Sequence, residues 1–164
     1  MPESQTPPLT VGHPAPEFSL SAMTREGEKT ISLSDFKGKK SVVVYFYPKD
    51  DTPGCTKEAC GFRDLRPDFD AVSAEILGVS CDSVASHDKF AAKFTLPFPL
   101  LSDPDHAVAE KFGAWKEKMN YGRTYWGIQR STYVIDKDGI VRKIWASVKV
   151  VLHPEKVLEV IKAL

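Results

Sequence analysis

Nearly continuous hydrophobic runs alternate with amphipathic stretches along the middle of this chain. Residues 41–48 (SVVVYFYP) are almost all β-branched or aromatic, which is typical of a central strand covered on both faces, and residues 74–80 (AEILGVS) predict a second buried strand. Helical spacing follows each run, over residues 55–69 and 83–94. The order strand, helix, strand, helix predicts parallel strands joined by right-handed crossovers.

The segments outside this central unit predict antiparallel additions to the same sheet. Residues 18–36 alternate around a Gly-containing turn, which indicates an N-terminal β-hairpin, and residues 131–147 indicate a second hairpin that turns at Lys137–Gly139. The remaining expected elements are an extended segment at 96–103, a helix at 104–115 and a helix at 153–164 that begins near Pro154. The fold class expected is α/β, with a central mixed β-sheet flanked by helices.

Length and composition narrow the class of protein. With 164 residues and 42% hydrophobic content, the chain fits one domain, expected over residues 10–164 after a flexible, Pro-rich tail at 1–9. No apolar stretch approaches the roughly 20 residues of a membrane span, and the start lacks the regions of a signal peptide, so a cytoplasmic location is expected. A net charge of zero with scattered basic residues argues against a nucleic-acid or membrane partner.

The chain has three cysteines, Cys55, Cys60 and Cys81. A secreted domain built on disulfides would have more of them, and an even number. Zinc would require thiols two to four residues apart with a second pair of ligands, and the histidines show no such spacing. No metal site is therefore expected. Redox or nucleophilic chemistry is the better explanation for any cysteine that has a function.

The segment before Cys55 is rich in residues with specific backbone preferences. Thr52 is a preferred N-cap residue, Pro53 suits the first helical position, and Cys55 then falls in the first turn, where N–H groups lack partners and the helix dipole favours a thiolate. Pro48 stiffens the loop, and Gly54 permits a close approach to the backbone. This pattern indicates a preformed pocket, although an ordinary capped turn with a buried cysteine has the same local features.

These residues also carry a resemblance to a known family. The pattern Pro48-x3-Thr52-x2-Cys55 matches the active-site signature of the peroxiredoxins, and residues 52–60 (TPGCTKEAC) resemble the bacterioferritin comigratory protein, or peroxiredoxin Q, branch. The resemblance covers nearly the whole chain after about Thr10 and continues through residues 86–94, 98–113 and 127–139. It implies a thioredoxin-like fold, and a reaction that needs no metal, haem or flavin.

The resemblance also implies a role for each matching residue. Cys55 is the expected peroxide-attacking (peroxidatic) thiol and Cys60 the expected resolving thiol, while Thr52 and Arg130 hold the peroxide and Pro48 shields the site. The implied activity is the reduction of hydrogen peroxide and small organic hydroperoxides. A sulfenic acid at Cys55 and an intramolecular disulfide between Cys55 and Cys60 are the implied intermediates. A thioredoxin-type protein is the expected reductant, and a monomer the expected state.

Chemistry supports these roles independently. Attack of a thiolate on a peroxide places negative charge on the departing oxygen, so the site needs hydrogen-bond donors, for which the Thr52 hydroxyl, the Cys55 N–H and Arg130 are suitable. Arg130 also adds a cation that favours the thiolate. Glu58, one helical turn after Cys55, is placed to orient Arg130 through a bidentate pair. Solvent-exposed surface charges are the alternative interpretation for both residues.

Two other features leave alternatives open. Cys81 ends the strand at 74–80 and is either a second candidate for the resolving thiol or, as we expect, a small and partly buried filler. The aromatic residues between Trp115 and Trp126 either line a substrate-side surface or, more commonly, pack in the core or its rim.

Two other functions fit a reactive cysteine at a helix start. One is a thiol–disulfide oxidoreductase of thioredoxin type, but that class uses C-x-x-C, whereas four residues separate Cys55 from Cys60, and Arg130 would have no role. The other is a redox-regulated holdase or binding module whose disulfide only switches shape.

The spacing of Cys55 and Cys60 carries a geometric prediction. Five residues along an α-helix separate two Cα atoms by roughly 8–9 Å, whereas disulfides rarely tolerate more than about 7 Å. A disulfide between these residues therefore requires the helix from Pro53 to about Cys60 to unwind. We expect the reduced protein to be fully helical there.

Overall fold

A computed structural model describes residues 9–164, so the first eight residues of the expected flexible tail lie outside the described part of the chain. The strands are β1 (Ser19–Thr24), β2 (Gly27–Ser32), β3 (Ser41–Phe46), β4 (Ala74–Ser80), β5 (Leu100–Ser102), β6 (Trp115–Asn120), β7 (Arg123–Ile128), β8 (Ser131–Ile135) and β9 (Val141–Trp145). The helices are the 3-10 helix η1 (Leu33–Phe36), α1 (Pro53–Asp64), α2 (Arg66–Ala71), α3 (Val84–Phe94), α4 (Ala107–Phe112) and α5 (His153–Lys162).

The main sheet has seven strands in the order β2-β1-β5-β4-β3-β8-β9. β3 pairs in parallel with β4, and β4 with β5, as the alternation of strands and helices predicts. The hairpin of β1 and β2 joins one side through antiparallel pairing of β1 with β5, and β8 and β9 extend the other side in antiparallel fashion. The predicted α/β thioredoxin-like fold with a mixed sheet and an N-terminal hairpin is confirmed.

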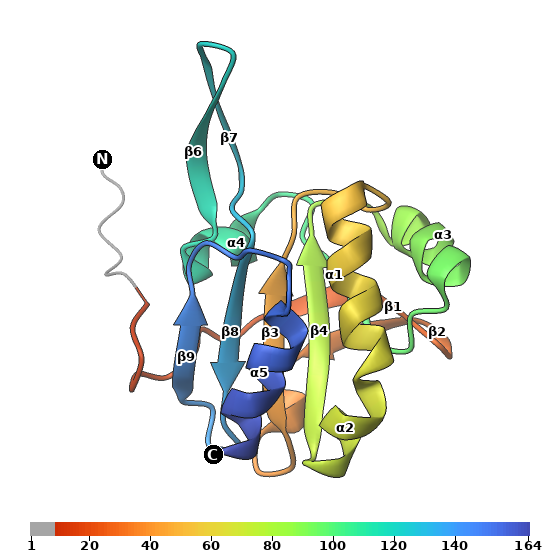
Figure 1. Cartoon of the computed structure of the whole chain (residues 1–164), viewed down its shortest axis with the longest axis vertical. Coiled ribbons are helices and arrows are strands. Elements are labelled where there is room, and N and C mark those ends of the chain that lie inside the picture. The colour runs from red at the N-terminus through yellow and green to blue at the C-terminus, as the bar shows by residue number, and fades with distance from the viewer. Residues whose placement is uncertain (1–8) are drawn as a thin grey trace.

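Helices cover both faces of this sheet, which explains the unbroken hydrophobic runs of β3 and β4. Every residue of these two strands is buried. Figure 1 shows α1, α2 and α5 in front of the sheet and α4 behind it. The front cluster contains Cys55, while the rear cluster is built from α4, η1 and the N-terminal hairpin. Because alternate residues of β3 point to opposite faces, Tyr45 belongs to the front cluster and Phe46 to the rear one.

Helix α1 carries the sequence features that predicted its start. Thr52 occupies the N-cap position and Pro53 the first turn, and α1 ends at Asp64. The expected helix over 55–69 is in fact two helices, because the helical conformation is interrupted at Leu65. A second helix, α2, then begins with a proline in its first turn. Near the end of α1, a Cβ atom at Gly61 would lie 2.8 Å from Cγ of Pro154, so the glycine allows α1 to pack closely on α5.

A separate two-stranded hairpin, formed by β6 and β7, projects from the body of the molecule (Figure 1). The pattern of hydrophobic residues did not predict it. Tyr121 and Gly122 form the two-residue loop and both have positive φ angles, of 52° and 77°, which matches the type I′ turn that suits hairpins. Among residues 9–164 no helix is long and apolar enough to span a membrane.

Candidate active site

The site lies where the chain leaves the carboxyl end of β3 and enters α1. The first intrahelical bond runs from the N–H of Thr56 to the carbonyl of Thr52 at 2.8 Å. The N–H groups of Gly54 and Cys55 therefore have no acceptor within the helix, and they lie at its N-terminus, the positive end of the helix dipole. The Cys55 side chain is buried, with 1% of its surface exposed. The predicted placement of this thiol in the first turn of a helix is confirmed.

Arg130 reaches this thiol from the segment between β7 and β8. Its Nη2 donates to the Cys55 Sγ at 3.3 Å, and its Nη1 donates to Oε1 of Glu58 at 2.7 Å. The guanidinium also passes close to the helix backbone, because a Cβ atom at Gly54 would lie 3.1 Å from Nη2. The close approach expected at Gly54 is therefore that of the arginine. A single cation thus bridges the thiol and a carboxylate, although 75 residues separate Arg130 from Cys55 in the sequence.

Glu58 is buried rather than exposed on the helix surface. Its side chain has 0% exposure, and Oε2 has no hydrogen-bond partner. Burial raises the pKa of Glu58 to about 7, and Arg130 opposes that rise. The pKa of Arg130 is raised because Glu58 and Cys55 together outweigh its own partial burial. The contact to Arg130 is monodentate, whereas the sequence favoured a bidentate pair.

The two remaining residues of the signature lie in the loop before α1. The Thr52 hydroxyl donates to the carbonyl of Lys49 at 2.9 Å and makes no capping bond, so its oxygen is left as an acceptor. This differs from the expected role as a free donor. Pro48 is exposed at the beginning of the loop.

The three cysteines occupy different environments, and all are free thiols. Cys60 is partly buried in α1, which is continuous through both Cys55 and Cys60, as predicted for the reduced protein. Cys81 packs against the rear cluster, on the other side of the sheet from Cys55. Burial and the nearby carboxylates of Asp103, Asp82 and Asp105 raise the pKa of Cys81 to about 11. These surroundings favour the filler interpretation, because a thiol that stays protonated is a poor nucleophile.

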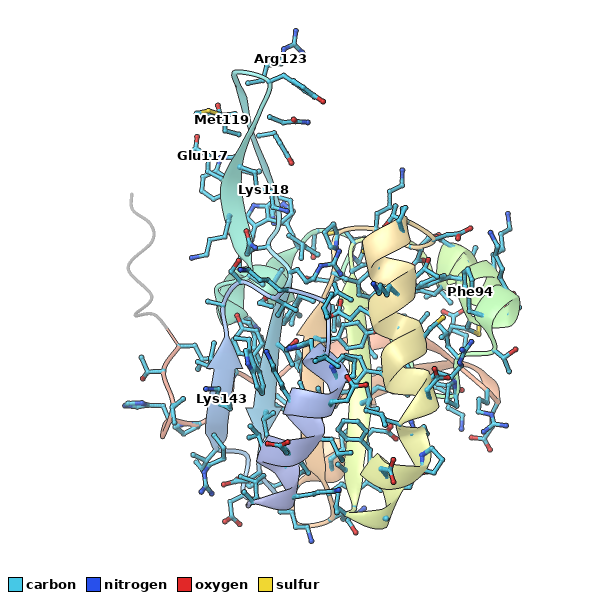
Figure 2. The ribbon with its side chains drawn as sticks, in the orientation of Figure 1. Phe94, Glu117, Lys118, Met119, Arg123 and Lys143 are labelled. Atoms are coloured by element: carbon cyan, nitrogen blue, oxygen red, sulfur yellow. The ribbon has the colours of Figure 1, made fainter. Side chains whose placement is uncertain are left out.

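Sequence reasoning missed Lys118, which lies on β6 of the projecting hairpin. Figure 2 shows Lys118 on the side of the hairpin that faces the body of the molecule, and Glu117 and Met119 on the other side. Burial and Arg130 lower the pKa of Lys118, while Cys55 acts in the opposite direction, so the ammonium lies within electrostatic range of the site. Exposed aromatic residues cover the hairpin around it: Tyr121 is 97% exposed and Trp126 58%. The core or rim packing expected for the aromatic residues holds for Trp115, which packs against the rear cluster, and is wrong for Tyr121, Tyr125 and Trp126, which are exposed.

Among residues 9–164 no three His, Cys, Asp or Glu side chains gather in a way that would hold a metal ion. The candidate site itself places a thiol beside a guanidinium, at the positive end of a helix. This arrangement suits attack by sulfur on an electrophile whose leaving group gains negative charge.

Comparisons with known proteins agree with this geometry. The AhpC/TSA family pattern matches residues 11–144. A putative peroxiredoxin bcp from Coxiella burnetii is 49% identical over 92% of this chain and 97% of its own length, and peroxiredoxin Bcp from Bacillus subtilis is 48% identical over 94% and 96%. Among solved structures, Xanthomonas campestris peroxiredoxin Q superimposes with a TM-score of 0.83 at 46% identity, covering 89% of this chain and 90% of that one.

A second Xanthomonas campestris structure, of a bacterioferritin comigratory protein described for its alkyl peroxide reduction activity, has a TM-score of 0.86. It is 42% identical and covers 94% of this chain and 98% of that one. The similarity therefore extends over the site and the whole sheet.

Proposed function

Because the chain belongs to the AhpC/TSA family, we propose that it is a thiol peroxidase of the peroxiredoxin Q type that reduces hydrogen peroxide and small organic hydroperoxides. The observation that carries the proposal is the guanidinium of Arg130, which bonds Cys55 Sγ and Glu58 together at the start of α1. This arrangement provides a cationic donor beside the sulfur, where the departing oxygen gains charge. The competing thioredoxin-type and holdase functions give the Arg130 contact no role.

In the first step the Cys55 thiolate attacks the terminal oxygen of the hydroperoxide. An S–O bond forms and the O–O bond breaks, so that Cys55 becomes a sulfenic acid and the remaining alkoxide takes a proton to leave as an alcohol, or as water from hydrogen peroxide. Arg130 and the free N–H groups at the helix start donate to the departing oxygen. The Thr52 oxygen, whose hydrogen is already bonded to Lys49, accepts from the peroxide O–H.

In the second step the Cys60 thiolate attacks the Cys55 sulfur. A disulfide forms and the sulfenic oxygen leaves as hydroxide, which becomes water after protonation. Both residues lie in one continuous helix, so α1 must unwind over at least residues 53–60 before the sulfurs meet. A thioredoxin-type dithiol protein then reduces the disulfide, and α1 forms again.

The test is steady-state peroxide consumption coupled to a thioredoxin system, measured for wild type and for three variants in which Cys55, Cys60 or Cys81 becomes serine. We expect Cys55→Ser to abolish turnover, and Cys60→Ser to accumulate a dimedone adduct at Cys55 while it loses efficient cycling. Cys81→Ser is the matched control and should cycle normally. Substantial turnover by Cys55→Ser would refute the proposal, and full activity of Cys60→Ser would transfer the resolving role to Cys81.

The same assay separates the peroxidase from the two other functions. A peroxidase consumes many equivalents of peroxide per protein molecule while reductant remains. A redox-switched holdase consumes one equivalent and stops, and a thiol–disulfide oxidoreductase reduces a disulfide substrate without any need for peroxide.

A further inference from the structure

A buried cluster of hydrogen bonds centred on Asp50 fixes the loop between β3 and α1. One carboxylate oxygen of Asp50 accepts from the Tyr47 hydroxyl at 2.6 Å, and the other accepts from the Ser86 hydroxyl at 2.8 Å. The backbone N–H of Asp50 donates to the Asp82 carboxylate at 2.8 Å. The loop is thereby tied to the first turn of α3 and to the end of β4, and Figure 1 shows it between α1 and α3 at the upper end of the sheet.

His87 completes the cluster from α3 and is fully buried. Its Nδ1 lies 2.7 Å from the second carboxylate oxygen of Asp50, and its Nε2 lies 2.9 Å from the carbonyl of Leu101. A carbonyl only accepts hydrogen bonds, so Nε2 carries a hydrogen, and a hydrogen bond joins Nδ1 to the Asp50 carboxyl group. His87 therefore bridges the loop, through Asp50, to the Leu101 carbonyl of β5.

The segment after Asp50 needs such an anchor. Asp51 has a φ angle of 56°, in the left-handed region that non-glycine residues adopt rarely and that persists where neighbouring contacts fix it. Its carboxylate pairs with Lys93 of α3 at 2.9 Å on the surface. The Thr52 hydroxyl then closes the turn on the Lys49 carbonyl. The buried bonds of Asp50 hold one side of this strained turn, and the start of α1 forms the other.

We propose that Asp50 and His87 are positioning residues for the peroxide-reducing site. They act through the loop: by fixing it to α3 and β5 they set where Thr52 and the first turn of α1 lie relative to Arg130. This inference rests on the proposed peroxidase function and extends it to residues outside the signature.

The arrangement divides the site into two parts with different mobility. Asp50, His87 and their partners lie before residue 53 or in other elements, so none of them has to move when α1 unwinds for disulfide formation. The loop keeps its place through the cycle, and after reduction the helix grows again from the same start.

The experiment compares two substitutions of His87 that each keep one of its nitrogens. An asparagine amide reproduces Nδ1 and can still donate to Asp50, whereas a glutamine amide reproduces Nε2 and can donate only to Leu101. Each is made in a Cys60→Ser background, so that the rate of sulfenic acid formation with hydrogen peroxide reports the first step alone. Alkylation of Cys55 by iodoacetamide, followed by mass spectrometry, is the reference reaction because it needs the thiolate but no peroxide-binding groups.

We expect His87→Gln and Asp50→Asn to slow sulfenic acid formation about tenfold, and His87→Asn to stay within about threefold of the Cys60→Ser parent. The rate of Cys55 alkylation should change less than about twofold in all three variants. Equal peroxide rates for His87→Gln and the parent, or an equal loss in both reactions, would overturn the positioning role. Absence of any peroxide reaction in the parent would refute the peroxidase proposal instead.

If His87→Gln does not fold, Ser86→Ala provides the test, since it removes a single donor to Asp50 at the edge of the cluster. We expect a loss of about threefold in the peroxide step with unchanged alkylation. An unchanged peroxide rate in that variant contradicts the proposal.

Discussion

Glu58 is a buried carboxylate that should make the stability of this protein depend on pH. Its side chain has no exposure, one oxygen accepts from Arg130, and the other has no partner. Burial raises its pKa to about 7 from an ordinary value of 4.5, and Arg130 reduces the rise without cancelling it. Replacing Glu58 by glutamine keeps an acceptor for Arg130 and removes the titration.

The direction in which stability changes with pH follows from proton binding to Glu58. Between pH 4.5 and about 7 the folded state holds a proton on Glu58 that the unfolded state has released. Folding stability attributable to Glu58 is therefore fully present below the unfolded pKa and is lost as the pH rises through the folded pKa. At about 1.4 kcal/mol per pKa unit, the gap between the two values amounts to about 3 kcal/mol.

The assay is urea unfolding at pH 4 and at pH 8, performed in a Cys55→Ser background so that no thiolate contributes. From pH 4 to pH 8 we expect the free energy of unfolding of the parent to fall by about 3 kcal/mol more than that of its Glu58→Gln derivative. The contributions of all other carboxylates cancel in this comparison. Glu28→Gln is the matched control, since Glu28 is exposed on β2, and its pH dependence should follow that of the parent. Parallel pH dependences for the Glu58→Gln derivative and its parent would refute the reasoning.

Three further predictions concern the site itself. Arg130→Ala should slow the peroxide step, measured by stopped flow, about 100- to 1,000-fold, by analogy with loss of one oxyanion donor. An unchanged rate would mean that Arg130 is only a surface charge. The disulfide form should exchange amide hydrogens faster than the reduced form across residues 53–62 with little change in β3 and β4, and indistinguishable rates there would favour another resolving partner. Lys118→Met should reduce the rate of Cys55 alkylation by iodoacetate relative to iodoacetamide about two- to fivefold, because it removes a cation near the thiol. Lys111→Met, at an exposed residue of α4, should leave that ratio unchanged.

The elements that the sequence predicted best are those whose environment is uniform. β3 and β4 are buried on both faces, so their hydrophobic runs needed no information about partners. β6 and β7 were missed because both faces are largely exposed, and nothing in their sequence alternates as a half-buried strand does. The only local signal was the glycine after Tyr121, at the second position of the turn.

Within the site, local features were predictable and distant contacts were not. The position of Cys55 at the start of α1 followed from the threonine and proline before it. The contact of Arg130 with Cys55 bridges 75 residues and was expected only from the resemblance to peroxiredoxins. The bond between Asp50 and His87 bridges 37 residues, and nothing in the sequence distinguished this histidine from an ordinary one on an amphipathic helix.

The close packing of Gly61 on Pro154 limits how far α1 can unwind in the proposed cycle. Phe62, which follows it, is fully buried and stacks on Tyr45 with ring centroids 4.8 Å apart, so the last turn of the helix stays attached to α5 and the sheet. Residues 53–60 are then the part of α1 that can lengthen by unwinding. Eight residues rise about 12 Å as helix and reach about 26 Å when extended, so unwinding releases about 14 Å of chain. That slack is enough to carry a disulfide from the buried pocket to the surface, where a reductant of fixed shape can meet it while the rest of the protein stays folded.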